Sequence, residues 1–234
     1  MLEIKNIVVQ YFPTYAVHKL SLDIHKGEMI GLFGNNGSGK TSLLHAIAGI
    51  VPLKEGEILL DGELITHKNM ERIAYGGASH QLPMMFSTNQ LIEFYQMQYP
   101  RFNRERFKEL WEHFNFQGRK KIKQMSSGER IQLDTALALS MGADYILLDE
   151  PFVGSDYFIK EEFYRLLLSI MTPDETVIFS THLIEEVKSL ISRAIILSSG
   201  ELFADYNEQD LEEGALINYL KTENRVCTKI TSTN

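Results

Sequence analysis

Residues 29–49 read MIGLFGNNGSGKTSLLHAIAG. An apolar run at 29–33 stops at Gly34, and the glycine-rich segment 34–41 is followed by residues of helix-forming composition. A buried strand, a glycine loop and a helix in this order are the context in which the pattern G-x-x-x-x-G-K-[ST] marks a phosphate site. The stretch therefore predicts a nucleotide-binding loop; the alternative is a glycine-rich turn without a ligand.

Each part of this loop has a role in the prediction. Glycines reach backbone angles that let several N–H groups point into one concavity, and the start of the following helix adds about half a positive charge. Lys40 is expected to reach the β- and γ-phosphates of the nucleotide, and Thr41 to ligate Mg²⁺. The predicted phosphate-binding residues are Gly34, Asn35, Asn36, Gly37, Ser38, Gly39, Lys40, Thr41 and Ser42.

The composition of the 234-residue chain is that of a globular protein, with 44% hydrophobic and 23% charged residues. The formal net charge of −8 argues against a nucleic-acid partner, which would require a basic surface. The single cysteine, Cys227, excludes an internal disulfide and fits a reducing compartment. No run approaches the roughly 18 apolar residues of a membrane span, and the N-terminus alternates like a strand. Any work at a membrane would therefore need a partner that supplies the spans.

The N-terminal part of the chain predicts a mostly antiparallel sheet around the nucleotide loop. Strands are expected at 2–9 and 16–24 because apolar residues alternate there, with a turn at 12–14 between them. Residues 56–65 predict a hairpin around Asp61-Gly62.

From about His80 to Gln124 the composition shifts to aromatic, Met and charged residues at helical spacing, which predicts an inserted helical subdomain at about 80–142. Strands separated by helices follow, as expected for a parallel sheet with right-handed crossovers. The polar end at 222–234 is expected to be frayed. The predicted helices are 89–97, 104–114, 127–141, 160–171 and 184–191, and the predicted strands are 145–148, 176–180 and 194–197.

The apolar strand at 145–148 leads directly to two carboxylates, Asp149 and Glu150. A buried strand can deliver an acid beside the phosphate loop, where Asp149 would hold Mg²⁺ directly or through water. Glu150 would then orient and deprotonate the attacking water. An acid pair of this kind is common on surfaces, but its combination with the glycine loop favours the functional interpretation.

The order of these motifs over residues 1–205 resembles that of the ATP-binding cassette (ABC) subunits of membrane transporters, with 206–234 as a short, partly disordered extension. The resemblance implies an α/β P-loop NTPase cassette with a mostly parallel core sheet, an antiparallel β subdomain and an inserted helical subdomain. Residues 125–130, MSSGER, resemble the family's signature segment, usually Leu-Ser-Gly-Gly-Gln. The resemblance implies that four residues grip the γ-phosphate of ATP held by a second cassette: Ser126, Ser127, Gly128 and Glu129. Ser126 and Glu129 also form the pattern of a helix capping box.

Three further positions take roles from the same resemblance. Asp156 corresponds to the acid of the D-loop, and His182 to the switch histidine that contacts the γ-phosphate and positions the water. Tyr11 corresponds to the aromatic residue that stacks on adenine, with Tyr15 as the alternative. One position departs from the family: Ala78 stands where the Q-loop glutamine is expected, and Gln81, three residues on, would replace it only in a rearranged loop.

The resemblance implies a function and partners. The chain would hydrolyse ATP with Mg²⁺ as a homo- or heterodimer of cassettes, and would drive a separate permease from the cytoplasmic face of the cell membrane. Residues 99–110 and 120–125 resemble bacterial ABC-2-type export cassettes, whose cargo is often a drug, a lipid or an antimicrobial peptide. An importer ATPase and a soluble non-transport ABC ATPase are the alternatives. The segments at Ser126 and His182 disfavour a P-loop kinase.

Residues 82–86 (LPMMF), with Phe94, Tyr95 and Met97, predict the groove where the permease docks. The alternative is that these residues pack the core of the helical subdomain itself. Leu82 and Phe94 are expected to be buried in that core, whereas Met85 and Phe86 are expected to be exposed.

Overall fold

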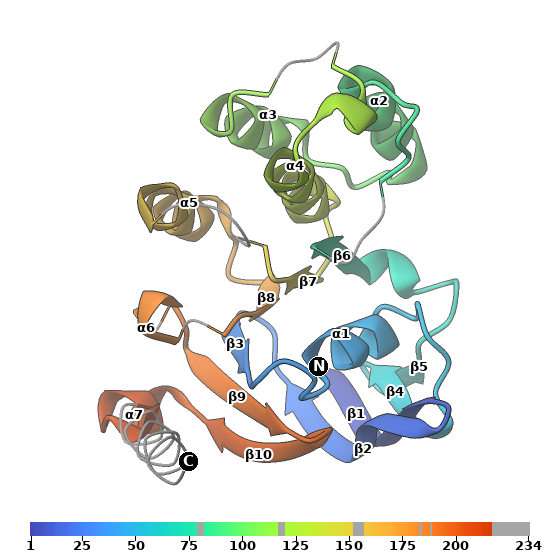
Figure 1. The fold of residues 1–234 in the computed structure, drawn as a ribbon, viewed down its shortest axis with the longest axis vertical. Helices are drawn as coiled ribbons and strands as arrows, with labels where there is room; N and C mark the ends of the chain where they lie inside the picture. The colour runs from blue at the N-terminus through green and yellow to red at the C-terminus, as the bar shows by residue number, and fades with distance from the viewer. Residues whose placement is uncertain (79–81, 117–119, 152–156, 183, 188, 217–234) are drawn as a thin grey trace, which may run out of the picture.

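A computed structural model describes residues 1–78, 82–116, 120–151, 157–182, 184–187 and 189–216 (Figure 1). Its first sheet has four strands in the order β2-β1-β4-β5, and every pair in it is antiparallel. The hairpins predicted at 2–24 and 56–65 are confirmed. The strands are β1 (Leu2–Tyr11), β2 (Thr14–Ile24), β4 (Glu55–Leu60) and β5 (Glu63–Leu64).

The second sheet has six strands in the order β10-β9-β3-β8-β7-β6, all parallel except β10, which pairs antiparallel with β9. The parallel core predicted from the sequence is confirmed, while β6 and β10 were not predicted. The carboxyl ends of parallel strands meet at one edge, so β3, β7 and β8 deliver their following residues to the same place. The strands are β3 (Met29–Phe33), β6 (Ile73–Gly77), β7 (Tyr145–Asp149), β8 (Thr176–Ser180), β9 (Arg193–Ser198) and β10 (Glu201–Tyr206).

Helices α1 to α4 lie close to the predicted ranges, α5 begins three residues before its predicted start, and α7 was not predicted. Helices α2 and α3 lie with α4 apart from the antiparallel sheet (Figure 1). The predicted limits of the helical subdomain stay a prediction. The helix predicted at 184–191 is wrong in length, because α6 ends at Val187 and residues 189–190 form a turn. The helices are α1 (Lys40–Ile47), α2 (Thr88–Gln98), α3 (Arg104–His113), α4 (Ser127–Ser140), α5 (Tyr157–Ile170), α6 (Ile184–Val187) and α7 (Glu208–Glu212), with 3-10 turns at Met70–Arg72 and Ile122–Gln124.

The parallel sheet is covered on both faces, and this explains why its strands are apolar throughout. On β7, Tyr145 and Leu147 belong to one core, shared with α1 and the antiparallel sheet. Ile146 and Leu148 belong to the other core, shared with the helices α3 and α4. Side chains on a strand alternate between faces, so each central strand is anchored in both cores.

The buried side chain of Arg106 ties α3 to the loop before β8. It donates to both carboxylate oxygens of Glu175 at 2.7 and 2.8 Å, and to the carbonyls of Leu139 and Ile170. Burial alone would raise the pKa of Glu175, but the hydrogen bonds from Arg106 and Thr172 hold it below its usual value. The guanidinium of Arg106 and the carboxylate of Glu175 therefore supply each other with the hydrogen bonds that water would otherwise make.

We expect Arg106→Met to lower the free energy of unfolding by about 3 kcal/mol, because it leaves the Glu175 carboxylate buried without its partner. Denaturant unfolding measures the loss. The control is Lys108→Met on the same helix, whose 3.8 Å pair with Glu112 is exposed and should contribute less than about 0.5 kcal/mol. The stabilisation is present above the ordinary pKa of 4.5 and disappears as the pH falls through the lower pKa of folded Glu175. An effect of Arg106→Met as small as that of the control would contradict this account.

Candidate nucleotide-binding site

The loop between β3 and α1 has a backbone that only glycine adopts without strain at two key points. Gly34 and Gly39 have φ angles of 145° and 104°. A Cβ atom at Gly34 would lie 2.4 Å from the carbonyl oxygen of Leu197, and one at Gly39 would lie 2.4 Å from that of Ala16. No side chain caps α1, which begins directly after Gly39. A helix start of this kind presents backbone N–H groups to an anion.

Lys40 lies within this loop rather than in solvent. Its Nζ donates to the carbonyl of Gly34 at 2.7 Å and to that of Asn35 at 3.2 Å, and the residue is 7% exposed. Burial lowers the pKa of Lys40, and the nearby charges of Glu150 and Asp149 act in the opposite direction. The ammonium group is therefore held in the place where the loop would bind a phosphate.

Asp149, at the end of β7, lies against Thr41 although 108 positions separate them in the chain. Thr41 Oγ1 donates to Oδ1 and Oδ2 of Asp149 at 3.1 and 3.0 Å, and Ser180 Oγ donates to Oδ1 at 2.7 Å. A hydroxyl and a carboxylate are hard oxygen donors that suit Mg²⁺, which usually takes one or two carboxylates together with phosphate and water. The donor chemistry fits the cation; within the described ranges there is no cluster of three or more His, Cys, Asp and Glu that would suit another metal.

The two predicted catalytic residues are brought together at the same edge. His182 Nδ1 lies 3.3 Å from Glu150 Oε1. The backbone N–H of Glu150 donates to Ser180 Oγ at 2.9 Å, and its φ of 47° is unusual for a residue with a side chain. Ser180 therefore connects the backbone of Glu150 to the carboxylate of Asp149.

A cavity of about 320 Å³ lies between this edge and the β1–β2 hairpin. Tyr15 contributes to its wall and Tyr11 does not, so the geometry favours the alternative that the sequence left open for adenine stacking. The hydroxyl of Tyr15 accepts from Lys54 Nζ at 2.9 Å, and the same nitrogen lies 4.7 Å from the ring centroid. The lining residues are Thr14, Tyr15, Ala16, Asn36, Gly37, Gly39, Lys40, Thr41, Ser42 and Glu150.

The signature segment forms the predicted capping box at the start of α4. Ser126 Oγ accepts from the N–H of Glu129 at 3.2 Å, and Glu129 Oε2 accepts from the N–H of Ser126 at 2.7 Å. Lys120 also bonds Glu129 and lowers its pKa. No residue of 126–129 lines the cavity of about 320 Å³ beside Lys40. Asp156 lies outside the described residues.

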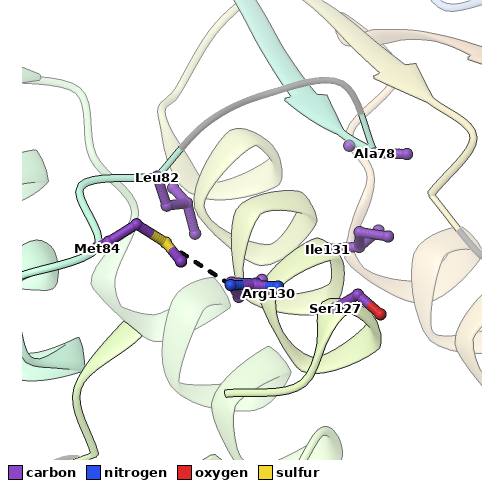
Figure 2. A pocket seen from close by; sticks show the side chains of 7 residues that line it. Ala78, Leu82, Met84, Ser127, Arg130 and Ile131 are labelled. Carbon is purple, nitrogen blue, oxygen red and sulfur yellow. Dashed lines mark hydrogen bonds between the residues drawn. The ribbon is translucent and has the colours of Figure 1, made fainter. Parts of the chain in front are cut away.

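A second cavity, of about 340 Å³, lies between the end of β6 and the start of α4 (Figure 2). It is lined by Gly77, Ala78, Leu82, Met84, Ser127, Arg130 and Ile131. The backbone N–H of Ala78 donates to the carbonyl of Asp149 at 2.8 Å, and that of Gly77 donates to Oδ2 of the buried Asp134 at 2.7 Å. Sequence reasoning missed Asp134, although a carboxylate in the apolar run of α4 was a usable signal. Gln81 lies outside the described residues.

The predicted docking segment is exposed in part. Met85 and Phe86 are 67% and 38% exposed and Leu82 is buried, as predicted. Burial of Phe94 was predicted wrongly, since it is 48% exposed and makes an edge contact with Phe86. The reason is helical phase: α2 buries Leu91 and Tyr95 against the core, and Phe94 lies to the side of that face.

Comparisons with known proteins agree with this geometry. Residues 17–153, more than half of the chain, match the family model described as ABC transporter. The ABC transporter ATP-binding protein YtrB of Bacillus subtilis (strain 168) is 29% identical over 216 residues, which cover 91% of this chain and 73% of YtrB. The lipopolysaccharide export system ATP-binding protein LptB of Escherichia coli (strain K12) is 29% identical over 212 residues, covering 86% of this chain and 88% of LptB.

Solved structures show the same fold. A dimeric post-hydrolysis state of the ATP-binding cassette MJ0796, bound to ADP and Pi, superposes with a TM-score of 0.77 at 23% identity, covering 89% of this chain and 99% of that one. CbiO1 of Clostridium perfringens, part of the transporter complex cbiONQ, gives 0.71 at 22% identity, covering 99% and 98%.

The chain belongs to the ABC transporter family, as an ATP-binding subunit, and ATP hydrolysis is the activity of that family. None of the helices in the described ranges, of which the longest have 14 residues, is long and apolar enough to cross a membrane.

We expect Lys40→Ala to weaken ATP binding about 10- to 100-fold, because it removes a charge-assisted hydrogen bond to phosphate. Isothermal titration calorimetry on the full chain measures the affinity. Replacement of the exposed Lys68 by Ala is the control and should leave it unchanged. Equal affinities of the wild type and Lys40→Ala would refute the assignment of the phosphate loop.

Proposed function

We propose that the chain binds ATP with Mg²⁺ on the loop at 34–41, hydrolyses it within a pair of cassettes, and drives a separate membrane permease. The observation that carries this proposal is the convergence of Lys40, Thr41, Asp149 and Glu150 at the carboxyl edge of the parallel sheet. The phosphates would lie on the loop amides and Lys40, and adenine on the ring of Tyr15.

Thr41 and Asp149 would hold Mg²⁺, which supplies charge neutralisation for the phosphates when bound. Glu150 would accept a proton from the attacking water. The hydrogen bond from its backbone N–H to Ser180 Oγ holds the main chain from which the Glu150 side chain extends. His182, already beside Glu150 Oε1, would contact the γ-phosphate and hold the water in line. These roles use residues that already contact one another at one edge of the sheet.

A second cassette would complete the site. The signature residues Ser126 to Glu129 lie outside the phosphate cavity of their own chain, and Ser126 and Ser127 are exposed. In a head-to-tail pair they would reach the γ-phosphate on the partner. The dimeric structure of the cassette MJ0796 supports the pairing of two cassettes.

A permease would dock on the exposed apolar surface formed by Met85, Phe86, Phe94 and Met97. Flexible methionines and aromatic rings suit an inserted partner helix. Through that partner the chain would act at the cytoplasmic face of the cell membrane. The names of LptB and of the Nod factor export ATP-binding protein I favour export. The resemblance of residues 99–110 and 120–125 to ABC-2-type export cassettes implies a drug, a lipid or an antimicrobial peptide as cargo. An importer is the alternative.

The variant Glu150→Gln is expected to bind ATP normally but to lose turnover by about 10²- to 10⁴-fold, because it removes the general base. Phosphate release measures turnover, and light scattering with ATP and Mg²⁺ should show a longer-lived dimer than in the wild type. The exposed Glu63→Gln serves as the control. Turnover of Glu150→Gln at the wild-type rate would exclude Glu150 as the base.

Replacing Met85 and Phe86 together by Ser should leave the subunit folded, with near-normal basal ATPase activity, but should abolish co-purification with the permease. The reason is that both side chains are exposed before assembly and supply its apolar contact. The matched control is the double replacement of Leu202 and Phe203 by Ser on β10, an exposed apolar pair far from this surface. Unfolding of the first variant, or its full assembly, would place the docking site elsewhere.

A further inference from the structure

Two side chains outside the established motifs form a polar chain that ends on Asp149. His45 Nε2 lies 2.9 Å from the hydroxyl of Tyr75, and this hydroxyl donates to Asp149 Oδ2 at 3.3 Å. The rings of His45 and Tyr75 also meet edge to face, with centroids 5.1 Å apart. This series of hydrogen bonds therefore joins α1, β6 and β7.

The local structure explains why these groups meet. His45 lies four residues after Thr41 on α1, so both side chains project from the same face of that helix. Tyr75 on β6 pairs with Leu147 on β7, two positions before Asp149, and points to the face of the sheet on which α1 packs. One helix thus places Thr41 against the carboxylate and His45 against the hydroxyl of Tyr75.

The positions of the protons follow from the chemistry of the groups. An ionised carboxylate only accepts hydrogen bonds, so the hydroxyl of Tyr75 is the donor in its hydrogen bond with Asp149. The oxygen of Tyr75 then accepts from His45, which requires a proton on Nε2. With the proton on Nδ1 alone, Nε2 would instead compete with Asp149 for the Tyr75 proton.

We propose that Tyr75 and His45 are positioning residues of the magnesium site, which fix the orientation of the Asp149 carboxylate. The proposal rests on the Mg²⁺ site proposed above for Thr41 and Asp149. Ser180 donates to Oδ1 and Tyr75 to Oδ2, so the two oxygens are held from opposite sides. Neither donor belongs to α1, so both would keep their hydrogen bonds if Thr41 bound a cation instead of Asp149. Partners that orient metal ligands in this way typically change metal affinity about 10- to 100-fold.

The test measures metal binding separately from catalysis. Electron paramagnetic resonance titrates Mn²⁺ into the full chain with a non-hydrolysable ATP analogue, and fluorescence measures nucleotide binding in EDTA. Tyr75→Phe and His45→Leu should each weaken Mn²⁺ binding about tenfold and leave metal-free nucleotide binding unchanged. His45→Gln should bind Mn²⁺ like the wild type, because its amide can donate to Tyr75.

The matched control for Tyr75→Phe is Tyr145→Phe on the adjacent strand β7. The Tyr145 hydroxyl is buried and has no hydrogen-bond partner among the described residues, so its loss should not change Mn²⁺ binding. Unchanged Mn²⁺ affinity in Tyr75→Phe and His45→Leu would overturn the proposal, as would equal losses in His45→Gln and His45→Leu. Failure of the wild type itself to bind Mn²⁺ with the nucleotide would instead refute the magnesium site.

Discussion

The buried carboxylate of Asp149 is the constraint on which the site depends. It is 2% exposed, and a charge removed from water in this way must be surrounded by donors. Those donors come from α1, β6 and β8, so the carboxylate fixes the relative positions of three elements that are distant in the chain. The same contacts place the loop with Lys40 opposite Glu150. The hydrogen bonds that stabilise the buried carboxylate are therefore the same ones that position the residues of the candidate site.

The features that the sequence predicts well are those whose cause is local. Glycine at 34 and 39 is required by the backbone and by close carbonyls, and this requirement is visible in the spacing of the motif. The capping box at Ser126 is likewise local, since both of its hydrogen bonds join residues three positions apart. Burial on both faces explains why the core strands contain continuous apolar runs, at 145–148 and at 177–179.

The features that were missed depend on contacts between distant parts of the chain. Strand β6 is short and ends in two glycines, so its residues carry little strand signal, and it is ordered by pairing with β7. Whether Tyr11 or Tyr15 lines the cavity beside the glycine loop depends on how the β1–β2 hairpin packs against that loop, and alignment of the motif alone cannot show this. The bonds of Tyr75 to Asp149 and of Asp134 to Gly77 span 74 and 57 positions.

The backbone at Gly77 and Ala78 joins α4 to the end of β7. A side chain at position 78 is not needed to join α4 to the end of β7, because the main chain makes the connection. Asp134 on α4 accepts from the N–H of Gly77, and the next N–H, that of Ala78, donates to the carbonyl of Asp149. Any Cβ at Gly77 would lie 2.1 Å from that carbonyl oxygen, so the close approach itself requires glycine. Helix α4 is thus linked to β7 through the consecutive backbone amides of Gly77 and Ala78, whichever side chain stands at 78.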